Sequence, residues 1–262
     1  MGRVPQNLEP IIGIPAQSGK KKDTKASMGR EVSSLQRYIA DIHRVLDQLS
    51  VVQIDEAVRY IQEARHNGRQ VFVMGNGGSA STASHFACDL GKNTRHNGKR
   101  PLRVIALTDN MALFSALAND EGYDNVFAQQ LEALARPNDL LLAISTSGNS
   151  KNVLEAVRLA QELKARTIGM TGFDGGTLGK LVDVNLHVPS HSIEQVEDMH
   201  LLLAHMITVA LRDMAAAEAS VSSAYQPPEI SAQPSENGSV RHEPKQANEA
   251  PLVLKKRDDK WN

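Results

Sequence analysis

The feature that most constrains the fold of this chain is an alternation of short apolar runs with longer stretches of helical spacing. Five short apolar runs are each bounded by turn residues: 71–74, 102–107, 140–144, 167–170 and 182–188. Helical stretches follow them at 79–92, 110–118, 124–135, 150–164 and 193–214. Strands that alternate with helices form βαβ units, whose parallel sheet is covered on both faces. The pattern therefore predicts an α/β fold, an αβα sandwich with a mostly parallel five-stranded sheet.

Two further helices are predicted before the first strand. Apolar residues recur at spacings of three and four between Val32 and Leu49, and again between Ile54 and Ala64. The second stretch ends at the pair Asn67-Gly68, which is a helix-stop signal.

The two ends of the chain differ in composition from this core. Residues 1–28 contain three prolines and a run of three lysines, and residues 217–262 contain five prolines among Ser, Glu, Gln and Asn. Neither segment has the apolar content that would offset the entropy lost on ordering. We therefore predict disordered tails at 1–28 and 217–262 around a single domain at 29–216.

Charge and composition exclude several classes of protein. The chain carries 29 Lys and Arg against 30 Asp and Glu, and its aromatic content is 4%, so neither backbone contacts nor base stacking favour a nucleic-acid partner. Its single cysteine, Cys88, excludes an intramolecular disulfide and fits a reducing compartment. No apolar run approaches the roughly 20 residues that span a bilayer, and no secretory signal is visible. We expect a cytoplasmic protein with no membrane or nucleic-acid partner.

Two loops after predicted strands carry ligand-binding signals. The first reads Gly75-Asn76-Gly77-Gly78-Ser79 and leads into a helix, so its backbone N–H groups can approach an anion. It matches neither the dinucleotide-binding nor the Walker pattern, and a tight strand-to-helix turn alone would also explain it. The second reads Ser145-Thr146-Ser147-Gly148-Asn149-Ser150. A helix N-cap needs only one of these side chains, whereas four hydroxyls at a helix start can hold a phosphate without lysine or metal.

Two predicted helices carry candidate acid–base and metal-binding groups. His85 and Asp89 are four residues apart, and Glu197 and His205 are eight apart, so each pair shares a helical face. Imidazole and carboxylate groups that converge from two helices can bind Zn²⁺ or transfer protons. Taken singly, each residue is more often an ordinary core or surface group.

Four motifs together resemble the sugar isomerase (SIS) domain, and more closely its phosphoheptose isomerase branch. They are the two loops above, Ala118-Asn119-Asp120, and the glycine-rich Thr171–Gly176. The resemblance runs from about residue 30 to 214. It implies an isomerase that converts sedoheptulose 7-phosphate to a heptose 7-phosphate through an enediol, with bound Zn²⁺ and a homotetramer whose pockets lie between subunits.

The resemblance also implies roles for individual residues. The phosphate would be held by Ser145, Thr146, Ser147 and Ser150. The sugar would be lined by Asn76, Gly77, Gly78, Ser79, Asn119 and Asp120. Asp89 or Glu197 would be the base and His205 its acid–base partner, and the metal ligands would be His85, Asp89, Glu197 and His205.

Two positions depart from the family pattern. Asp89 stands where phosphoheptose isomerases have Glu, and Glu197 stands where they have Gln, while His85 and His205 match. One alternative is a non-catalytic sugar-phosphate-binding or scaffold protein, such as the relative that associates with the bacterial replication initiator. Another is a sugar-phosphate-sensing regulator, for which the segment before the core is too short to hold a DNA-binding domain.

Overall fold

The computed structural model describes the backbone of residues 24–96 and 100–224, and side chains within 33–96 and 100–217. Its centre is one sheet of order β2-β1-β3-β4-β5, in which all neighbouring strands pair in parallel. The strands are β1 (Gln70–Gly75), β2 (Arg103–Ala106), β3 (Leu140–Ser145), β4 (Arg166–Thr171) and β5 (Val184–His187). The predicted five-stranded parallel sheet is confirmed.

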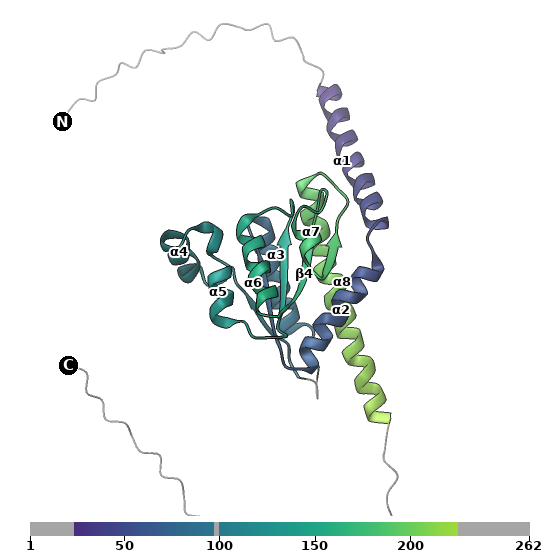
Figure 1. Ribbon diagram of the computed structural model, residues 1–262. Coiled ribbons are helices and arrows are strands. Elements are labelled where there is room, and N and C mark those ends of the chain that lie inside the picture. The colour runs from purple at the N-terminus through teal and green to yellow at the C-terminus, as the bar shows by residue number, and fades with distance from the viewer. Residues whose placement is uncertain (1–23, 97–99, 225–262) are drawn as a thin grey trace, which may run out of the picture. The chain divides into compact units, whose positions relative to one another are not determined.

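Helices precede, connect and follow these strands (Figure 1). They are α1 (Thr24–Asp47), α2 (Val51–His66), α3 (Gly78–Lys92), α4 (Met111–Asp120), the 3₁₀ helix η1 (Tyr123–Asn125), α5 (Ala128–Leu134), α6 (Lys151–Glu162), α7 (Leu178–Leu181) and α8 (Ile193–Ala224). The two helices predicted before the first strand are α1 and α2.

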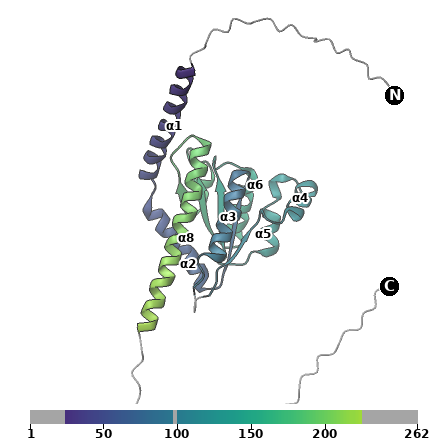
Figure 2. The same ribbon diagram turned by 180° about the vertical axis from the view of Figure 1, so that it is seen from behind.

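The sheet separates two apolar cores because successive side chains of a strand point to opposite faces. On β3, Leu140, Leu142 and Ile144 belong to the core shared with α2, α3 and α8. Leu141 and Ala143 belong to the core shared with α5 and α6. Figures 1 and 2 show these two helical layers from opposite sides. The result is the predicted αβα sandwich.

Several boundaries differ from the sequence-based expectation. The predicted helix at 124–135 is divided into η1 and α5, and the two residues between them, Val126 and Phe127, are fully buried in the core. The four-residue helix α7 was not predicted. Helix α1 begins at Thr24, and α8 continues to Ala224 through an alanine-rich run of high helix propensity. The remaining parts of the two predicted tails, 1–23 and 225–262, lie outside the described residues.

Helix α8 from Ile193 to Ala217 is long and apolar enough, by length and composition, to cross a membrane. Its buried side chains pack against the sheet, however, and 44% of the most apolar window is buried inside the chain. We interpret α8 as a core helix. At its start, the Tyr38 hydroxyl of α1 donates a hydrogen bond of 2.6 Å to Asp198, which raises the pKa of Tyr38 to about 12.

The strand order creates a crevice at the carboxyl ends of β1 and β3. From β1 the chain passes to β2 on one side, whereas β3 is followed by β4 and β5 on the other side. The helices after these two strands, α3 and α6, cover opposite faces of the sheet. In open parallel sheets such a switch point is where ligands bind. Both candidate loops lie here.

Candidate active site

The glycine loop turns tightly from β1 into α3. Gly77 is the N-cap of α3 with φ +55°, a conformation that glycine adopts without strain. Gly78 lies against α8, and a Cβ atom there would collide with the carboxylate of Glu197. The two glycines therefore allow α3 to begin in direct contact with a side chain of α8.

The hydroxyl loop, residues 145–150, connects β3 to α6. Ser150 is the N-cap of α6, but its side chain makes no capping hydrogen bond and instead accepts one of 3.3 Å from the Ser145 hydroxyl. The Ser147 hydroxyl accepts from the backbone of Asn149 at 3.2 Å. The hydroxyls of the loop therefore do not occupy the N–H groups of the first turn of α6, of which, within the described residues, only that of Val153 is taken, by the Asn152 side chain at 3.0 Å.

A pocket of about 160 Å³ lies between the two loops. Its walls combine hydroxyl, amide and carboxylate side chains: Asn76, Ser79, Ser145, Thr146, Ser147, Ser150 and Glu197, with Ile144 as the apolar member. The predicted phosphate-binding side chains therefore converge on one cavity. Pockets elsewhere on the described surface are larger, but this one lies at the switch point of the sheet.

The side chain of Asn76 is fixed by three hydrogen bonds. Its amide pairs reciprocally with that of Asn152, with both N–H···O distances at 2.9 Å, and the Tyr123 hydroxyl donates to the same Asn76 oxygen at 2.9 Å. Asn152 is buried in α6. This network joins the glycine loop to α6 and to η1, so the two pocket walls are held in one geometry.

A second group of functional side chains lies further along α3 and α8. The Nε2 atoms of His85 and His205 are 3.0 Å apart, and the Asp89 Oδ2 atom is 3.4 Å from the first and 3.7 Å from the second. The other Asp89 oxygen accepts a hydrogen bond of 2.7 Å from Asn93. The Asp89 side chain is 13% exposed, while the two histidines are about half exposed. One carboxylate oxygen and two imidazoles thus converge on one point.

The spacing of these three atoms fits a metal ion. Four ligands at about 2.0–2.2 Å from Zn²⁺ in a tetrahedron lie about 3.4 Å from one another, and the three atoms here lie within 4.8 Å of one another. Imidazole nitrogens and a carboxylate oxygen are common zinc ligands. The same atoms could exchange protons without a metal.

Glu197 does not belong to this cluster. Glu197 contacts Gly78 at the start of α3. His205 contacts His85, which lies on α3 seven residues after Gly78. An eight-residue separation brings two side chains to one face of a helix but leaves them about 12 Å apart along its axis. The four groups that the sequence predicted at one site are therefore divided between the hydroxyl pocket and the His85–Asp89–His205 cluster.

The structure does not bring Asn119 or Asp120 into the pocket. Both are exposed on α4, a helix with no buried residue among those described, and the Asn119 amide donates to Asp120 at 2.7 Å. Their assignment to sugar binding stays a prediction.

Comparison with known proteins identifies the family of this chain. A family model of the SIS domain matches residues 37–172. The phosphoheptose isomerase of Aliarcobacter butzleri is 40% identical over 183 residues, which are 70% of this chain and 94% of that protein. The chain belongs to the SIS-domain family.

Solved structures share the fold of this SIS domain. A phosphoheptose isomerase from Francisella tularensis superposes with a TM-score of 0.64 at 33% identity, over 71% of this chain and 98% of that one. The NanR protein of Vibrio vulnificus, solved in complex with ManNAc-6P, has a TM-score of 0.51 at 17% identity over 72% of this chain and 67% of that one. The second similarity concerns the fold alone.

The SIS domain contains positioning groups that the sequence did not single out. The loop after β4 supports the hydroxyl loop, because Gly172 N donates to Thr146 O at 2.9 Å and the Thr177 backbone and hydroxyl donate to Asn149 at 3.0 Å. The motif Thr171–Gly176 was recognised only through the family resemblance. Tyr123 and Asn152 act on Asn76 through tertiary contacts, for which the sequence has no local signal. Asn93 contacts Asp89 four residues earlier at the end of α3, a spacing that the sequence does contain.

Proposed function

We propose that this chain is an aldose–ketose isomerase of a phosphorylated sugar and that sedoheptulose 7-phosphate is its substrate. The observation that carries the proposal is the position of two groups along α3 and α8: the hydroxyl pocket at the helix starts, and His85, Asp89 and His205 about two turns further on. That offset is about 10–12 Å. An open-chain seven-carbon sugar phosphate, with bonds of about 1.5 Å, has a length of roughly 10 Å, so its phosphate and its carbonyl end could occupy the two groups together.

The proposed chemistry is a pair of proton transfers through an enediol. Asp89 removes the proton from carbon 1 of the open-chain ketose and returns it to carbon 2. His205 moves the second proton between the two oxygens, taking it from one and giving it to the other. The contacts of 3.4–3.7 Å between Asp89 and the two histidines support this division of roles, and Glu197 is too far along α8 to act as the base in the same cluster.

Asp89 is one methylene shorter than the glutamate that the family resemblance implies. Its reach toward a substrate is therefore shorter by about one bond, ~1.5 Å. The hydrogen bond from Asn93 to Oδ1 turns the remaining oxygen, Oδ2, toward the histidines. This fixed orientation supports Asp89 as a working base despite its length.

Zn²⁺ is the proposed cofactor. Because an atom bound to zinc cannot also carry a proton, His85 and one carboxylate oxygen of Asp89 would hold the ion, while the other Asp89 oxygen and the His205 imidazole keep the proton-transfer roles. When bound, zinc supplies a Lewis acid that polarises a carbonyl or enediolate oxygen. We expect prolonged dialysis against a chelator to remove stoichiometric metal and to lower turnover of sedoheptulose 7-phosphate by about 100-fold or more, with recovery on addition of Zn²⁺. Metal content is measured by mass spectrometry beside the activity. Full turnover by a metal-free preparation would contradict the cofactor assignment.

Glu197 makes a separate prediction because its carboxylate lines the pocket proposed for the phosphate. Two like charges about 6 Å apart repel by roughly 0.7 kcal/mol at the dielectric constant of water, and by more where protein replaces part of the water. We therefore expect Glu197→Gln to lower the KM for the sugar phosphate about fivefold, with a similar gain in affinity for inorganic phosphate. Glu194→Gln, an exposed change on the same helix, is the matched control. A higher KM for Glu197→Gln would instead show that the carboxylate supports binding.

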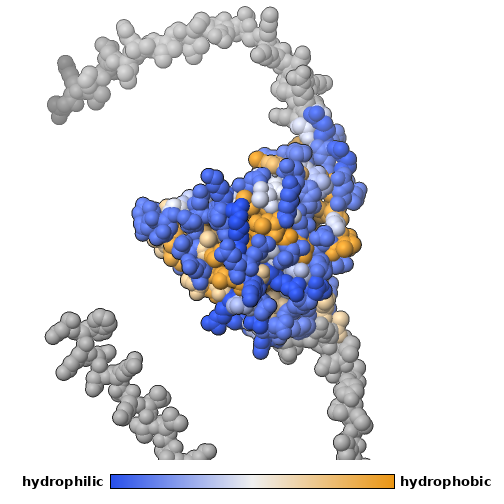
Figure 3. Space-filling view, viewed as in Figure 1, coloured by the Kyte–Doolittle hydropathy of each residue, from blue (hydrophilic) through white to orange (hydrophobic). Residues whose placement is uncertain are grey.

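Assembly into a homotetramer is part of the proposal. Large apolar side chains are exposed on α1, α2 and α8, and the most exposed are Leu35, Ile39, Val51, Val52 and Ile193. Figure 3 shows apolar surface on the side of the molecule where α1 and α2 lie. Burial against further copies of the chain would remove this surface from water. Sedimentation equilibrium tests the stoichiometry.

The substrate is tested directly with a panel of sugar phosphates. Sedoheptulose 7-phosphate should give an aldose product, detected by chromatography, with a higher kcat/KM than pentose or hexose ketose phosphates. Binding of the phosphates without any product would favour the non-catalytic alternative.

A further inference from the structure

A second pocket lies at the opposite end of the sheet, where the strands begin. It has a volume of about 350 Å³ and is lined from the loop before β1, the start of β2, and the end of α5 with the turn before β3. Strand β1, with six residues at about 3.3 Å each, separates it from the hydroxyl pocket by roughly 20 Å. It is therefore a different site from the one proposed for the sugar phosphate.

Arginine dominates the lining of this pocket. Three arginines line it: Arg69 before β1, Arg103 at the start of β2 and Arg136 in the turn before β3. The lining contains one carboxylate, that of Asp139. A fourth guanidinium, that of Arg100, lies against Gly68 at the rim, where a Cβ atom would collide with it. The charge of the lining is thus clearly positive in a chain whose formal net charge is −1.

These arginines are not paired with acidic side chains. In the part of the chain that the structure describes, Arg69, Arg103 and Arg136 form no ion pair. Arg103 donates to the Gly68 carbonyl at 3.2 Å and Arg69 to the Pro137 carbonyl at 3.4 Å. The Nε atom of Arg69 is buried without a hydrogen-bond partner. Buried donors without partners are uncommon in native proteins, so this N–H is a donor that a bound anion would satisfy.

The single carboxylate is already engaged by the backbone. Asp139 accepts hydrogen bonds of 2.8 Å from Gln70 N at one oxygen and from Arg136 N at the other. It is buried and closes the turn before β3. Its structural role leaves the guanidinium groups available to an anion from solution.

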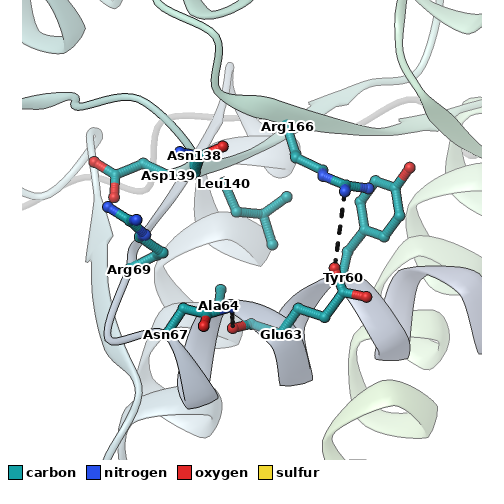
Figure 4. Close-up of a pocket in the computed structure, with 9 residues that line it drawn as sticks. All are labelled: Tyr60, Glu63, Ala64, Asn67, Arg69, Asn138, Asp139, Leu140 and Arg166. Atoms are coloured by element: carbon teal, nitrogen blue, oxygen red, sulfur yellow. Dashed lines mark hydrogen bonds and ion pairs between the residues drawn. The ribbon is translucent and has the colours of Figure 1, made fainter.

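The neighbouring pocket extends the same basic end of the sheet. Figure 4 shows Arg69 beside Asp139 on one side of it and Arg166 over the ring of Tyr60 on the other. Arg166 differs from the first three arginines because its Nη2 atom lies 4.0 Å from a Glu63 oxygen and its guanidinium carbon lies 4.5 Å from the Tyr60 ring centroid. The charges that line this neighbouring pocket therefore balance one another. The unpaired positive charge lies in the arginine-lined pocket, around Arg69, Arg103 and Arg136.

We infer that the arginine-lined pocket is a second anion site, which binds a small molecule with a phosphate or pyrophosphate group. Arginine recognises phosphate oxygens through paired N–H donors. The exposed side chains of Ile105 and Leu134 form an apolar part of the wall, which suits the organic portion of such a molecule. The volume is sufficient for a ligand of that size.

Calorimetric titration of the full chain with inorganic pyrophosphate at fixed ionic strength tests the inference. Two pyrophosphates are expected to bind each wild-type chain, one at the hydroxyl loop and one among the arginines. Ser147→Asp, which adds a carboxylate to the hydroxyl loop, should remove the first. Arg103→Gln combined with Arg136→Gln should weaken the second by about tenfold or more. The Arg136 side chain makes no hydrogen bond within the described residues, so its replacement should leave thermal unfolding unchanged.

Arg158→Gln is the matched control, since Arg158 is an exposed arginine on α6 outside the pocket. Unchanged pyrophosphate binding in the Arg103→Gln, Arg136→Gln double variant would overturn the inference. So would an equal loss in Arg158→Gln, because the effect would then be one of net charge. If the wild-type chain binds pyrophosphate among the arginines but not at the hydroxyl loop, that result counts against the proposed function and leaves this inference intact.

Discussion

Asp89→Asn and His205→Ala are each expected to reduce isomerase turnover by about 10²- to 10⁴-fold, the range associated with general acid–base groups. Asparagine keeps the shape of Asp89 and the hydrogen bond from Asn93 but cannot take a proton from carbon. Alanine at position 205 removes the imidazole that lies 3.0 Å from His85. Initial rates with sedoheptulose 7-phosphate measure both effects.

Binding separates a catalytic effect from a loss of the site. The phosphate would be held by the hydroxyl loop, whose hydrogen bonds involve neither Asp89 nor His205. We therefore expect the affinity for the sugar phosphate, measured by calorimetry, to change less than about threefold in both variants. Asp213→Asn, an exposed change further along α8, is the control for helix stability. Substantial turnover in both active-site variants would refute the assigned roles.

The core of the fold could be predicted because its signals are local. β3 is a nearly continuous apolar run that is buried along its whole length, and β4 is buried from Thr167 to Thr171. The break between η1 and α5 is not marked in the sequence, because the helical spacing continues through Val126 and Phe127 and both residues keep helical backbone angles. Propensity alone therefore could not locate that break.

The part of the site that could be predicted from the sequence is the part that lies within one short segment. The hydroxyl loop lies within six consecutive residues, and its side chains meet in the structure as expected. Helical periodicity also placed Glu197 and His205 correctly on one face. It says nothing of which residue of a neighbouring helix each one contacts, and this depends on the parallel register of α3 and α8. The separation of Glu197 from the cluster is a consequence of that register.

His200 makes the second large prediction, because it is a histidine enclosed by the protein. It is completely buried on α8, and its ring nitrogens make no hydrogen bond of normal geometry with the described residues. Burial lowers the pKa of His200 to about 4, which the Thr171 backbone offsets only in part and the nearby His187 reinforces. The ring is therefore neutral in the folded protein at physiological pH.

The effect on stability follows from the direction of this shift. Between about pH 6.5 and pH 4 the unfolded chain binds a proton at His200 that the folded chain does not. The contribution of the neutral His200 ring to the free energy of unfolding is therefore fully present above pH 6.5. It is lost as the pH falls toward 4, and the total loss is about 3 kcal/mol. His200→Leu replaces the ring by an apolar side chain and should abolish this part of the pH dependence.

Urea unfolding of wild type and His200→Leu at a series of pH values, at one chain concentration, measures the difference. The difference in unfolding free energy between variant and wild type should grow by about 3 kcal/mol as the pH falls from 7.5 to 4. Carboxylates titrate in the same range, but they contribute equally to both proteins and cancel. His43→Gln, a change at an exposed histidine on α1, should leave the pH dependence unchanged. If wild type and His200→Leu lose stability in parallel, then His200 is protonated in the folded state or is hydrated there, and its enclosure does not control the acid sensitivity of the fold.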